Sequence, residues 1–348
     1  MIKIKFIESN NNLGDSFLKL NISGDITCYH MNALRRTIFS NIKTRAFASN
    51  NYNFKKNTST FHNGILMKRI SLIPIWITDD IIINQNNNKE LFKSNNIINY
   101  KDNIKKSNNN DDADNDDYEI ENTIKNNTST SLIQLTMYLK FNNKKNEIVN
   151  VTTSDCLFYF GENKINSPYE DPLLLLKLNP GEEIELSAVT DIGNENKHTN
   201  YTAVNIAIYK CIDKSPNNFI FELESTGQIP EIRILLISIK YILEMLDYFL
   251  KLIIKKIELK NLDEGQFTIL DNQNEIYDLH TLEGLILNGL HTHKNVISAS
   301  CNLLHPLSDT MIFDFKLREG NIISIINEII DNLNLVYNNM YSEIEKLN

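Results

Sequence analysis

Asn32-Ala33-Leu34-Arg35-Arg36 places two adjacent arginines on an otherwise apolar helix. Apolar side chains around this stretch recur at spacings of three and four residues, which puts them on one helix face: Met31, Leu34, Ile38 and Ile42. Arg35 and Arg36 lie on the flank of that face, and Thr27 can cap the first turn. The pattern therefore predicts a helix of about four turns whose flank carries two guanidinium groups.

Strand patterns occur on both sides of this helix in the sequence. Apolar and polar residues alternate from Ile2 to Phe6 and again from Leu18 to Ile22, which indicates two strands with one buried face. Further strands are expected near residues 203–212 and 219–224. These segments predict mixed helix and sheet structure.

Two later segments carry the longest helical stripes of the chain. Within residues 232–257 and again within residues 322–347, apolar residues recur by threes and fours, so each helix has one long apolar face. Because such faces are not stable in water, we predict that the two helices pack against each other. The residues expected in the core of this contact are Leu235, Ile239, Leu246, Ile326, Leu333 and Met340.

The middle of the chain, residues 45–199, has mainly strand and turn signals. We expect extended structure over residues 46–56, a short helix from Phe61 to Lys68, and a strand from Leu72 to Ile77. Strand alternation returns from Ile133 to Phe141. The pattern predicts a small β-rich domain.

Residues 84–131 interrupt this region with Asn runs and an acidic cluster. The segment has too little apolar surface to offset the entropy of ordering, so we expect a disordered surface insertion. A calcium loop is the alternative, since carboxylates alternate there. The central Gly and the terminal Glu of such a loop are missing at the required spacing, which disfavours it.

The composition of the 348-residue chain bounds its class. A hydrophobic fraction of 42% and a charged fraction of 23% are typical of a folded soluble protein with two or three domains. A formal net charge of -9 argues against the whole chain gripping nucleic acid, because phosphate contacts need clustered Lys and Arg. No apolar run approaches the roughly 18 residues of a membrane span. The four cysteines are scattered, which predicts free thiols and no structural zinc.

Motifs in the first part of the chain resemble an assembly subunit of cellular RNA polymerases. The helix motif at residues 32–36, followed by Asn57-Thr58-Ser59 and by the stretch from Arg69 to Ile75, is similar to the third subunit of RNA polymerase II. Segments 178–184 and 219–227 resemble further motifs of that subunit, in the same order. Several motifs in family order are more specific than any one alone.

A second resemblance lies near the C-terminus. His280-Thr281-Leu282-Glu283-Gly284 and the later His305-Pro306-Leu307 are similar to the eleventh subunit of the same polymerase. That family has Gly and Asn where this chain has Glu283 and Gly284. Both partners of a heterodimer are therefore expected on one polypeptide.

The resemblance implies an α+β fold. Two alpha-subunit-like dimerisation halves would pack as an intrachain pseudodimer, with an inserted β-rich domain. The implied domains are residues 1–44 with 200–262 for the third-subunit-like half, 45–199 for the inserted domain, and 263–348 for the eleventh-subunit-like half. A fusion of these subunits in a chain rich in Asn, Ile and Lys resembles the transcription apparatus of a large cytoplasmic DNA virus.

The resemblance also implies a function. The chain would be a non-catalytic assembly platform of a multisubunit DNA-directed RNA polymerase, holding the two largest subunits together. Its implied partners are the largest and second-largest subunits and a small zinc-bearing subunit, without direct contact to nucleic acid. The residues expected at the large subunits are Asn32, Leu34, Arg35, Arg36, His280, Thr281 and Leu282, with Arg36 favoured over Arg35 as the contact to the second-largest subunit. No cofactor or metal is expected, and the location would be host cytoplasm and virion for a viral chain, otherwise the nucleus.

The residues alone leave simpler interpretations open. An arginine pair on a helix is usually a solvated flank. His280, His291, His293 and His305 invite a metal or general-base interpretation, but their spacing matches no recognised ligand set, so capping and turn roles are favoured. No nucleophile motif or glycine-rich phosphate loop is visible, which predicts no enzymatic activity of its own. The rival class is a free-standing protein-interaction adaptor or oligomerisation module unrelated to transcription.

Overall fold

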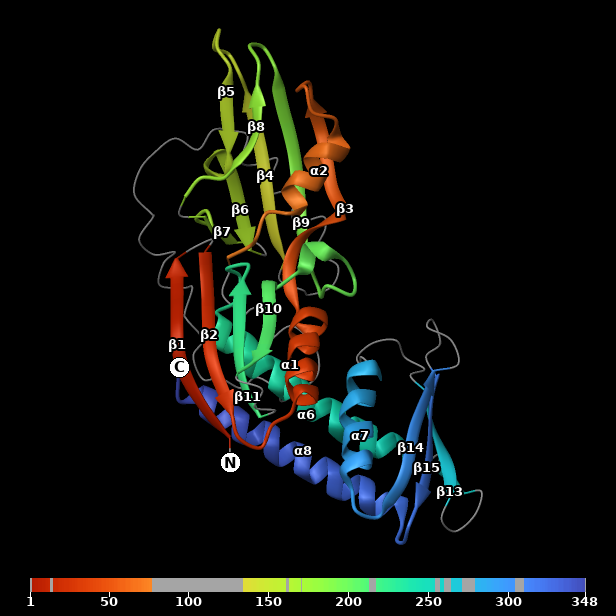
Figure 1. Cartoon of the computed structure of the whole chain (residues 1–348). Coiled ribbons are helices and arrows are strands. Elements are labelled where there is room, and N and C mark those ends of the chain that lie inside the picture. The colour runs from red at the N-terminus through yellow and green to blue at the C-terminus, as the bar shows by residue number, and fades with distance from the viewer. Residues whose placement is uncertain are drawn as a thin grey trace. The chain divides into compact units, whose positions relative to one another are not determined.

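The computed structural model divides into two compact units, both drawn in Figure 1. It describes residues 2–12, 15–76, 134–160, 163–169, 171–212, 217–253, 257–259, 264–270, 279–303 and 310–347. The first unit comprises Met1–Ile42, Asn194–Asn196 and Thr202–Asn348, and the second comprises Lys43–Gly193 and Lys197–Tyr201. The insertion predicted at residues 84–131 lies outside the described residues.

The first unit contains a four-stranded antiparallel sheet with two helices. Its strands follow the order β1-β2-β11-β10. The elements are β1 (Lys3–Asn12), β2 (Asp15–Ser23), α1 (Cys28–Asn41), β10 (Val204–Cys211), β11 (Asn218–Ser225) and α6 (Glu231–Ile253). Leu20 of β2 lies opposite Phe221 of β11, and both are buried. The buried face predicted for Leu18 to Ile22 is confirmed, but in β1 the predicted face is wrong at its end, because Ile2 is buried whereas Phe6 is 53% exposed.

A second four-stranded antiparallel sheet in the same unit repeats this topology. Its elements are β12 (Ile257–Leu259), β13 (Glu264–Leu270), α7 (Leu279–Thr292), β14 (Val296–Leu303), β15 (Thr310–Leu317) and α8 (Ile322–Glu345). The strand order is β12-β13-β15-β14. In each sheet the fourth strand in sequence lies between the second and the third, a 14-residue helix follows the second strand, and a long helix follows the fourth. Both third strands, β10 and β14, also have a register shift directly after their first valine.

The long helices α6 and α8 pack against each other, as Figure 1 shows. Their apolar stripes join residues from both sheets in one hydrophobic core. All six side chains predicted for this contact are buried there: Leu235, Ile239, Leu246, Ile326, Leu333 and Met340. The predicted extent of the first stripe is wrong at its end, because Ile257 begins β12 and lies opposite Phe267 of β13.

Helix α1 forms where the apolar spacing predicts it. Thr27 occupies the N-cap position, and its backbone N–H donates to His30 Nδ1 at 3.1 Å, so the ring satisfies a backbone group that the helix itself cannot pair. The four residues of the predicted apolar face are buried: Met31, Leu34, Ile38 and Ile42. The burial of this face leaves the opposite side of α1 toward solvent.

The second unit is mainly β structure around its own core. Its five-stranded sheet has the order β3-β9-β4-β6-β7, and β5 pairs with β8 in a separate two-stranded sheet. The strands are β3 (Thr44–Asn57), β4 (Leu135–Asn142), β5 (Val149–Thr152), β6 (Cys156–Phe160), β7 (Asn163–Ile165), β8 (Leu174–Leu178) and β9 (Glu183–Gly193). Asn179-Pro180-Gly181 forms the turn between β8 and β9, with Gly181 at a φ of 80° that suits glycine.

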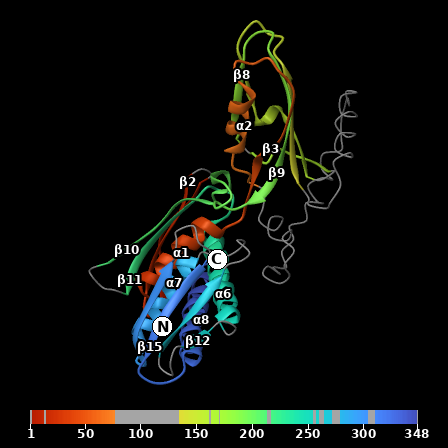
Figure 2. The same cartoon turned by 90° about the vertical axis from the view of Figure 1, so that its right-hand side faces the viewer.

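Helix α2 (Asn63–Ser71) packs on β3 and β8 in this unit (Figure 2). It begins later than the short helix predicted from Phe61 to Lys68 and ends at Ser71, directly before the segment predicted as a strand from Leu72 to Ile77. That strand is absent over the described residues 72–76. Leu72 is instead the C-cap, and its backbone N–H bonds to the carbonyls of the last helical turn. Ile77 lies outside the described residues.

No helix among the described residues is both long enough and apolar enough to cross a membrane.

Candidate functional site

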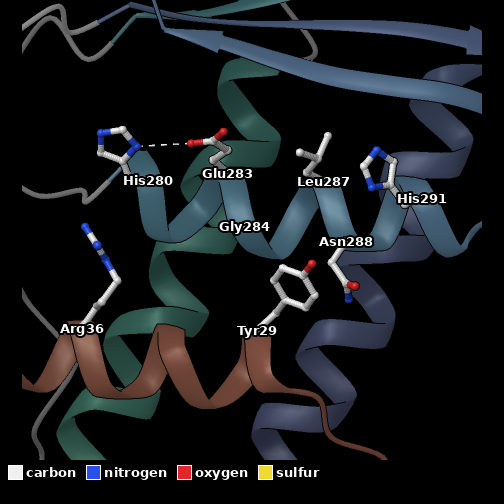
Figure 3. Close-up of a pocket in the computed structure, with 8 residues that line it drawn as sticks. All are labelled: Tyr29, Arg36, His280, Glu283, Gly284, Leu287, Asn288 and His291. Atoms are coloured by element: carbon white, nitrogen blue, oxygen red, sulfur yellow. Dashed lines mark hydrogen bonds and ion pairs between the residues drawn. The ribbon is translucent and has the colours of Figure 1, made fainter. Parts of the chain in front are cut away.

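Helices α1 and α7 lie side by side in the first unit and run in opposite directions (Figure 3). Tyr29 and His291 lie toward one end of the pair, and Arg36 and His280 toward the other. Both helices bury one side in the common core, so their outer sides form an exposed surface. This surface brings together the two motifs that the sequence places far apart.

A groove between the two helices is the clearest feature of this surface. It has a volume of about 480 Å³, and we call it the α1–α7 groove. Its walls include Tyr29 and Arg36 from α1 and His280, Glu283, Gly284 and Leu287 from α7. Asn288 and His291 complete it at the end where Tyr29 lies.

Arg36 joins the two helices directly. Its Nε donates a hydrogen bond of 2.9 Å to Thr281 Oγ1, and Thr281 is only 4% exposed. Two residues that the sequence predicts separately as partner contacts therefore touch each other where α1 meets α7. Because the hydrogen bond fixes the direction of a half-buried guanidinium, it holds a positive charge in a defined place at this surface.

The other residues predicted at this surface divide into exposed and buried groups. Arg35 bonds within α1, where its Nη2 donates to Asn32 Oδ1 at 2.9 Å, and Asn32 is exposed. Leu34 and Leu282 are 0% and 3% exposed and belong to the core. The two leucines pack the helices onto the hydrophobic core and do not form part of the exposed surface.

Glu283 connects α7 to the neighbouring strand. Its Oε2 lies 3.2 Å from His280 Nδ1, and it also interacts with the thiol of Cys301 on β14. Burial, followed by the nearby carboxylate of Glu283, raises the pKa of the Cys301 thiol to about 12. The thiol is therefore protonated at neutral pH and is a poor nucleophile.

The remaining histidines have separate partners. His291 Nε2 lies 2.8 Å from the carbonyl oxygen of Ala299, and His293 Nε2 lies 3.2 Å from Glu328 Oε2. His305 lies outside the described residues. Across the part of the chain that the structure describes, no three His, Cys, Asp or Glu side chains are gathered in a way that could hold a metal ion.

His30 and Tyr337 form a buried polar contact between α1 and α8. The Tyr337 hydroxyl donates to the carbonyl oxygen of His30 at 3.3 Å, and the two ring centroids are 5.8 Å apart. Burial lowers the pKa of His30 to about 4, so the imidazole is neutral at physiological pH. The contact ties the first helix of the chain to the last.

Sequence reasoning did not identify Tyr29, Leu287 or Asn288 as residues of this surface. A signal was present on α7, because residues 280, 283, 284, 287, 288 and 291 recur at helical spacing on the side opposite the apolar stripe. Tyr29 had no such signal, since an aromatic residue in a first helical turn is equally typical of a core.

The first unit has an α+β fold. Its two sheets have the same strand order, and their helices share one hydrophobic core. The sequence model of the family described as "RNA polymerase Rpb3/Rpb11 dimerisation domain" matches residues 25–246. The chain belongs to this family. The match ends within α6, so the second sheet with α7 and α8 lies beyond it.

A viral protein is also similar to this chain in sequence. A protein of Acanthamoeba polyphaga mimivirus that is described as a DNA-directed RNA polymerase subunit is 24% identical over 227 residues. The aligned region is 62% of this chain and 60% of the relative. This chain therefore matches less than two thirds of the relative's length.

Proposed function

We propose that the chain is a non-catalytic assembly platform of a multisubunit DNA-directed RNA polymerase and holds the two largest subunits together. Its family membership and its viral relative support the polymerase context. The single observation that carries the platform role is the repeated topology. Two sheets with the same strand order, each with a short and a long helix, share one core through α6 and α8.

This repeat supports the proposal that a third-subunit-like half and an eleventh-subunit-like half are fused as an intrachain pseudodimer. The proposed halves are residues 1–44 with 200–262, and residues 263–348, with residues 45–199 as an inserted β-rich domain. Fusion makes the association of the halves intramolecular, so the pair does not depend on protomer concentration. The two halves then set the relative positions of two large chains.

The proposed docking surface is the outer side of α1 and α7. Asn32, Arg35, Arg36 and His280 supply exposed or half-exposed polar groups there, and Thr281 positions Arg36. Arg36 is the proposed anchor for the second-largest subunit, and the half with α7 faces the largest. A small zinc-bearing subunit is the third proposed partner. For a viral chain the proposed location is the host cytoplasm and the virion.

Co-expression with the two largest subunits encoded by the same genome tests the platform role. A tag on this chain should recover both subunits. An adaptor unrelated to transcription would recover neither, and that result would overturn the proposal.

Two variants separate a partner contact of Arg36 from its bond to Thr281. Arg36→Ala removes the charge, whereas Thr281→Val keeps the volume of residue 281 and removes only the acceptor. If Arg36 pairs with a desolvated carboxylate of the partner, Arg36→Ala should weaken binding by about 2–5 kcal/mol. Thr281→Val should weaken it by about 1 kcal/mol, the typical net value of one hydrogen bond. Equal losses in both variants would show that Arg36 acts only within the chain.

A further inference from the structure

The two exposed thiols, Cys28 and Cys211, lie at the same end of the first sheet. Cys211 is the last residue of β10 and lies opposite Phe219 of β11, which in turn lies opposite Ile22 of β2. Strand β2 ends at Ser23, and residues 24–27 connect it to Cys28, the first residue of α1. Because α1 packs on β10, the chain returns at Cys28 to the end of the sheet where Cys211 lies (Figure 1).

Tyr209 of β10 connects the two positions. Its hydroxyl donates to the carbonyl oxygen of Cys28 at 3.4 Å, and its ring centroid lies 5.8 Å from that of Phe219. Since Phe219 is the residue opposite Cys211, the Tyr209 side chain leans along the strand toward Cys211. Tyr209 and Cys211 are two residues apart, so their side chains leave the same face of the sheet. The start of α1 is therefore held close to the end of β10.

The electrostatic environment of Tyr209 also includes both sulfur atoms. Burial raises the pKa of Tyr209, and negative charge on Cys28 and on Cys211 raises it further, whereas Arg35 lowers it. Because the interaction between two charges falls off with distance, each sulfur atom lies near the same hydroxyl oxygen. The two thiols thus share one neighbour in the first unit.

The other two cysteines have different surroundings. Cys156 is buried in the second unit, and Cys301 lies beside Glu283. Burial raises the pKa of each of these thiols to about 12, so both are protonated at neutral pH and react slowly with oxidants. Cysteines that sense oxidants are exposed and have a second thiol nearby. Of the four cysteines, all of which the structure describes, Cys28 and Cys211 fit this description.

We infer that Cys28 and Cys211 form an oxidation-sensitive pair, which a hydroperoxide converts into a disulfide and a small dithiol converts back. The inference does not depend on the proposed function, because it concerns contacts within the first unit. The bond ties the start of α1 to an edge strand of its sheet. Disulfides that form in a reducing compartment are usually transient and respond to a change in redox conditions.

The reaction moves two electrons from the sulfur atoms to the peroxide. One thiolate attacks a peroxide oxygen, so an S–O bond forms, the O–O bond breaks and the leaving oxygen takes up a proton. The second thiolate attacks the resulting sulfenic sulfur, so the S–S bond forms, the S–O bond breaks and hydroxide leaves and is protonated to water. A small dithiol reverses the step by thiol–disulfide exchange and is itself oxidised.

Peptide mapping of the oxidised full chain tests the inference. The reduced chain is treated with a small molar excess of hydrogen peroxide, its remaining thiols are blocked with N-ethylmaleimide under denaturing conditions, and the digested peptides are identified by mass spectrometry. The main product should be a peptide pair joined through Cys28 and Cys211, lighter by two hydrogen atoms and released by dithiothreitol. Cys156 and Cys301 should be recovered as N-ethylmaleimide adducts.

Cys28→Ser is the matched variant, because it removes the partner thiol and keeps a side chain of similar size. Dimedone, which traps sulfenic acids, should label Cys211 about tenfold more in this variant than in the wild type, where Cys28 consumes the sulfenic acid. Thermal unfolding checks that the variant folds.

Three results would overturn the inference. Dimedone adducts on both thiols of the wild type, without the joined peptide, would show that the sulfur atoms oxidise but do not meet. A joined peptide found only in a dimer band on a non-reducing gel would show that the bond forms between two copies of the chain. Full recovery of both thiols after peroxide treatment would show that the pair does not respond to oxidant.

Discussion

The buried imidazole of His30 makes the stability of the first unit depend on pH. His30 is 7% exposed, and burial lowers its pKa from 6.5 to about 4. An unfolded chain exposes the ring to water and returns its pKa to the ordinary value. Between these two values the unfolded chain binds a proton that the folded chain does not, so the free energy of unfolding rises with pH. This stability is fully present above pH 6.5 and is lost as the pH falls toward 4.

The size of the effect follows from the two pKa values. At about 1.4 kcal/mol per pH unit, the full contribution of His30 is about 3 kcal/mol. Linkage gives a loss of about 2 kcal/mol between neutral pH and about pH 5. Other groups also titrate in this range. Comparison of the wild type with a variant that lacks only this imidazole cancels their contribution to the free energy of unfolding. His30→Gln is suitable, because glutamine at the third position after Thr27 retains an acceptor for the capping interaction.

Urea unfolding at a series of pH values is the assay. Far-UV circular dichroism reports mainly the first unit, which contains the long helices α6 and α8, whereas the fluorescence of the single tryptophan, Trp76, reports the second unit. The wild type should lose about 2 kcal/mol more than His30→Gln between neutral pH and about pH 5. His198→Gln, at an exposed position in the second unit, should follow the wild type. Parallel pH profiles for the wild type and His30→Gln would refute the reasoning.

Three further predictions concern packing and reactivity. Gly289→Ala should lower the free energy of unfolding by about 1–3 kcal/mol, because its Cβ would overlap Ile329, while Gly284→Ala should not lower it; a urea titration of both variants decides. Leu333→Asp places an unpaired charge in the shared core, so hydrogen exchange should speed up in α6 as well as in α8, and wild-type protection of α6 would show that the halves fold independently. Alkylation at about pH 8 should leave the thiol of Cys301 unmodified, because its pKa is about 12; mass spectrometry of the peptides would reveal any early modification. The exposed thiols expected to react first are Cys28 and Cys211.

Apolar periodicity was enough to predict three helices of the common core, α1, α6 and α8. The sequence of residues 28–41 predicts a helix because its apolar positions recur at helical spacing. This signal does not depend on the identity of the packing partner. The contact between α6 and α8 was predictable for a related reason. Two long apolar helix faces in one chain must be buried away from water, and each can bury the other. Periodicity also placed Leu34 on the apolar face and Arg36 on its flank, whereas the motif resemblance named both as partner contacts without regard to burial.

The tertiary partners of polar groups were beyond the sequence. Nothing in the order of residues indicates that Arg36 donates to Thr281, because the two are far apart in the chain and meet only after α1 and α7 pack. Arg45 is a second case. Arginine is usually exposed, yet Arg45 is 1% exposed in the second unit, where its Nη1 donates to Thr190 Oγ1 at 3.1 Å and its guanidinium lies 5.6 Å from the Phe160 ring centroid. Burial lowers the pKa of Arg45 to about 10, which still leaves it charged at neutral pH.

The strand predicted from Leu72 to Ile77 is absent over the described residues 72–76 because local preference there was balanced. A short apolar run that contains a proline, here Pro74, fits a strand and the end of a helix equally well. The contact of α2 with β3 and β8 extends the helix to Ser71, and Leu72 then closes it. Tertiary packing thus decided a segment for which local preference was balanced.

The stoichiometry of the purified complex tests the central claim most directly. The chain is co-expressed with the largest and second-largest polymerase subunits of the same genome, and the intact complex is weighed by native mass spectrometry. The proposed platform role predicts one copy of this chain with one copy of each large subunit, because two fused halves would supply both docking sides. A complex that needs two copies of this chain, or a chain recovered without either large subunit, would contradict the account.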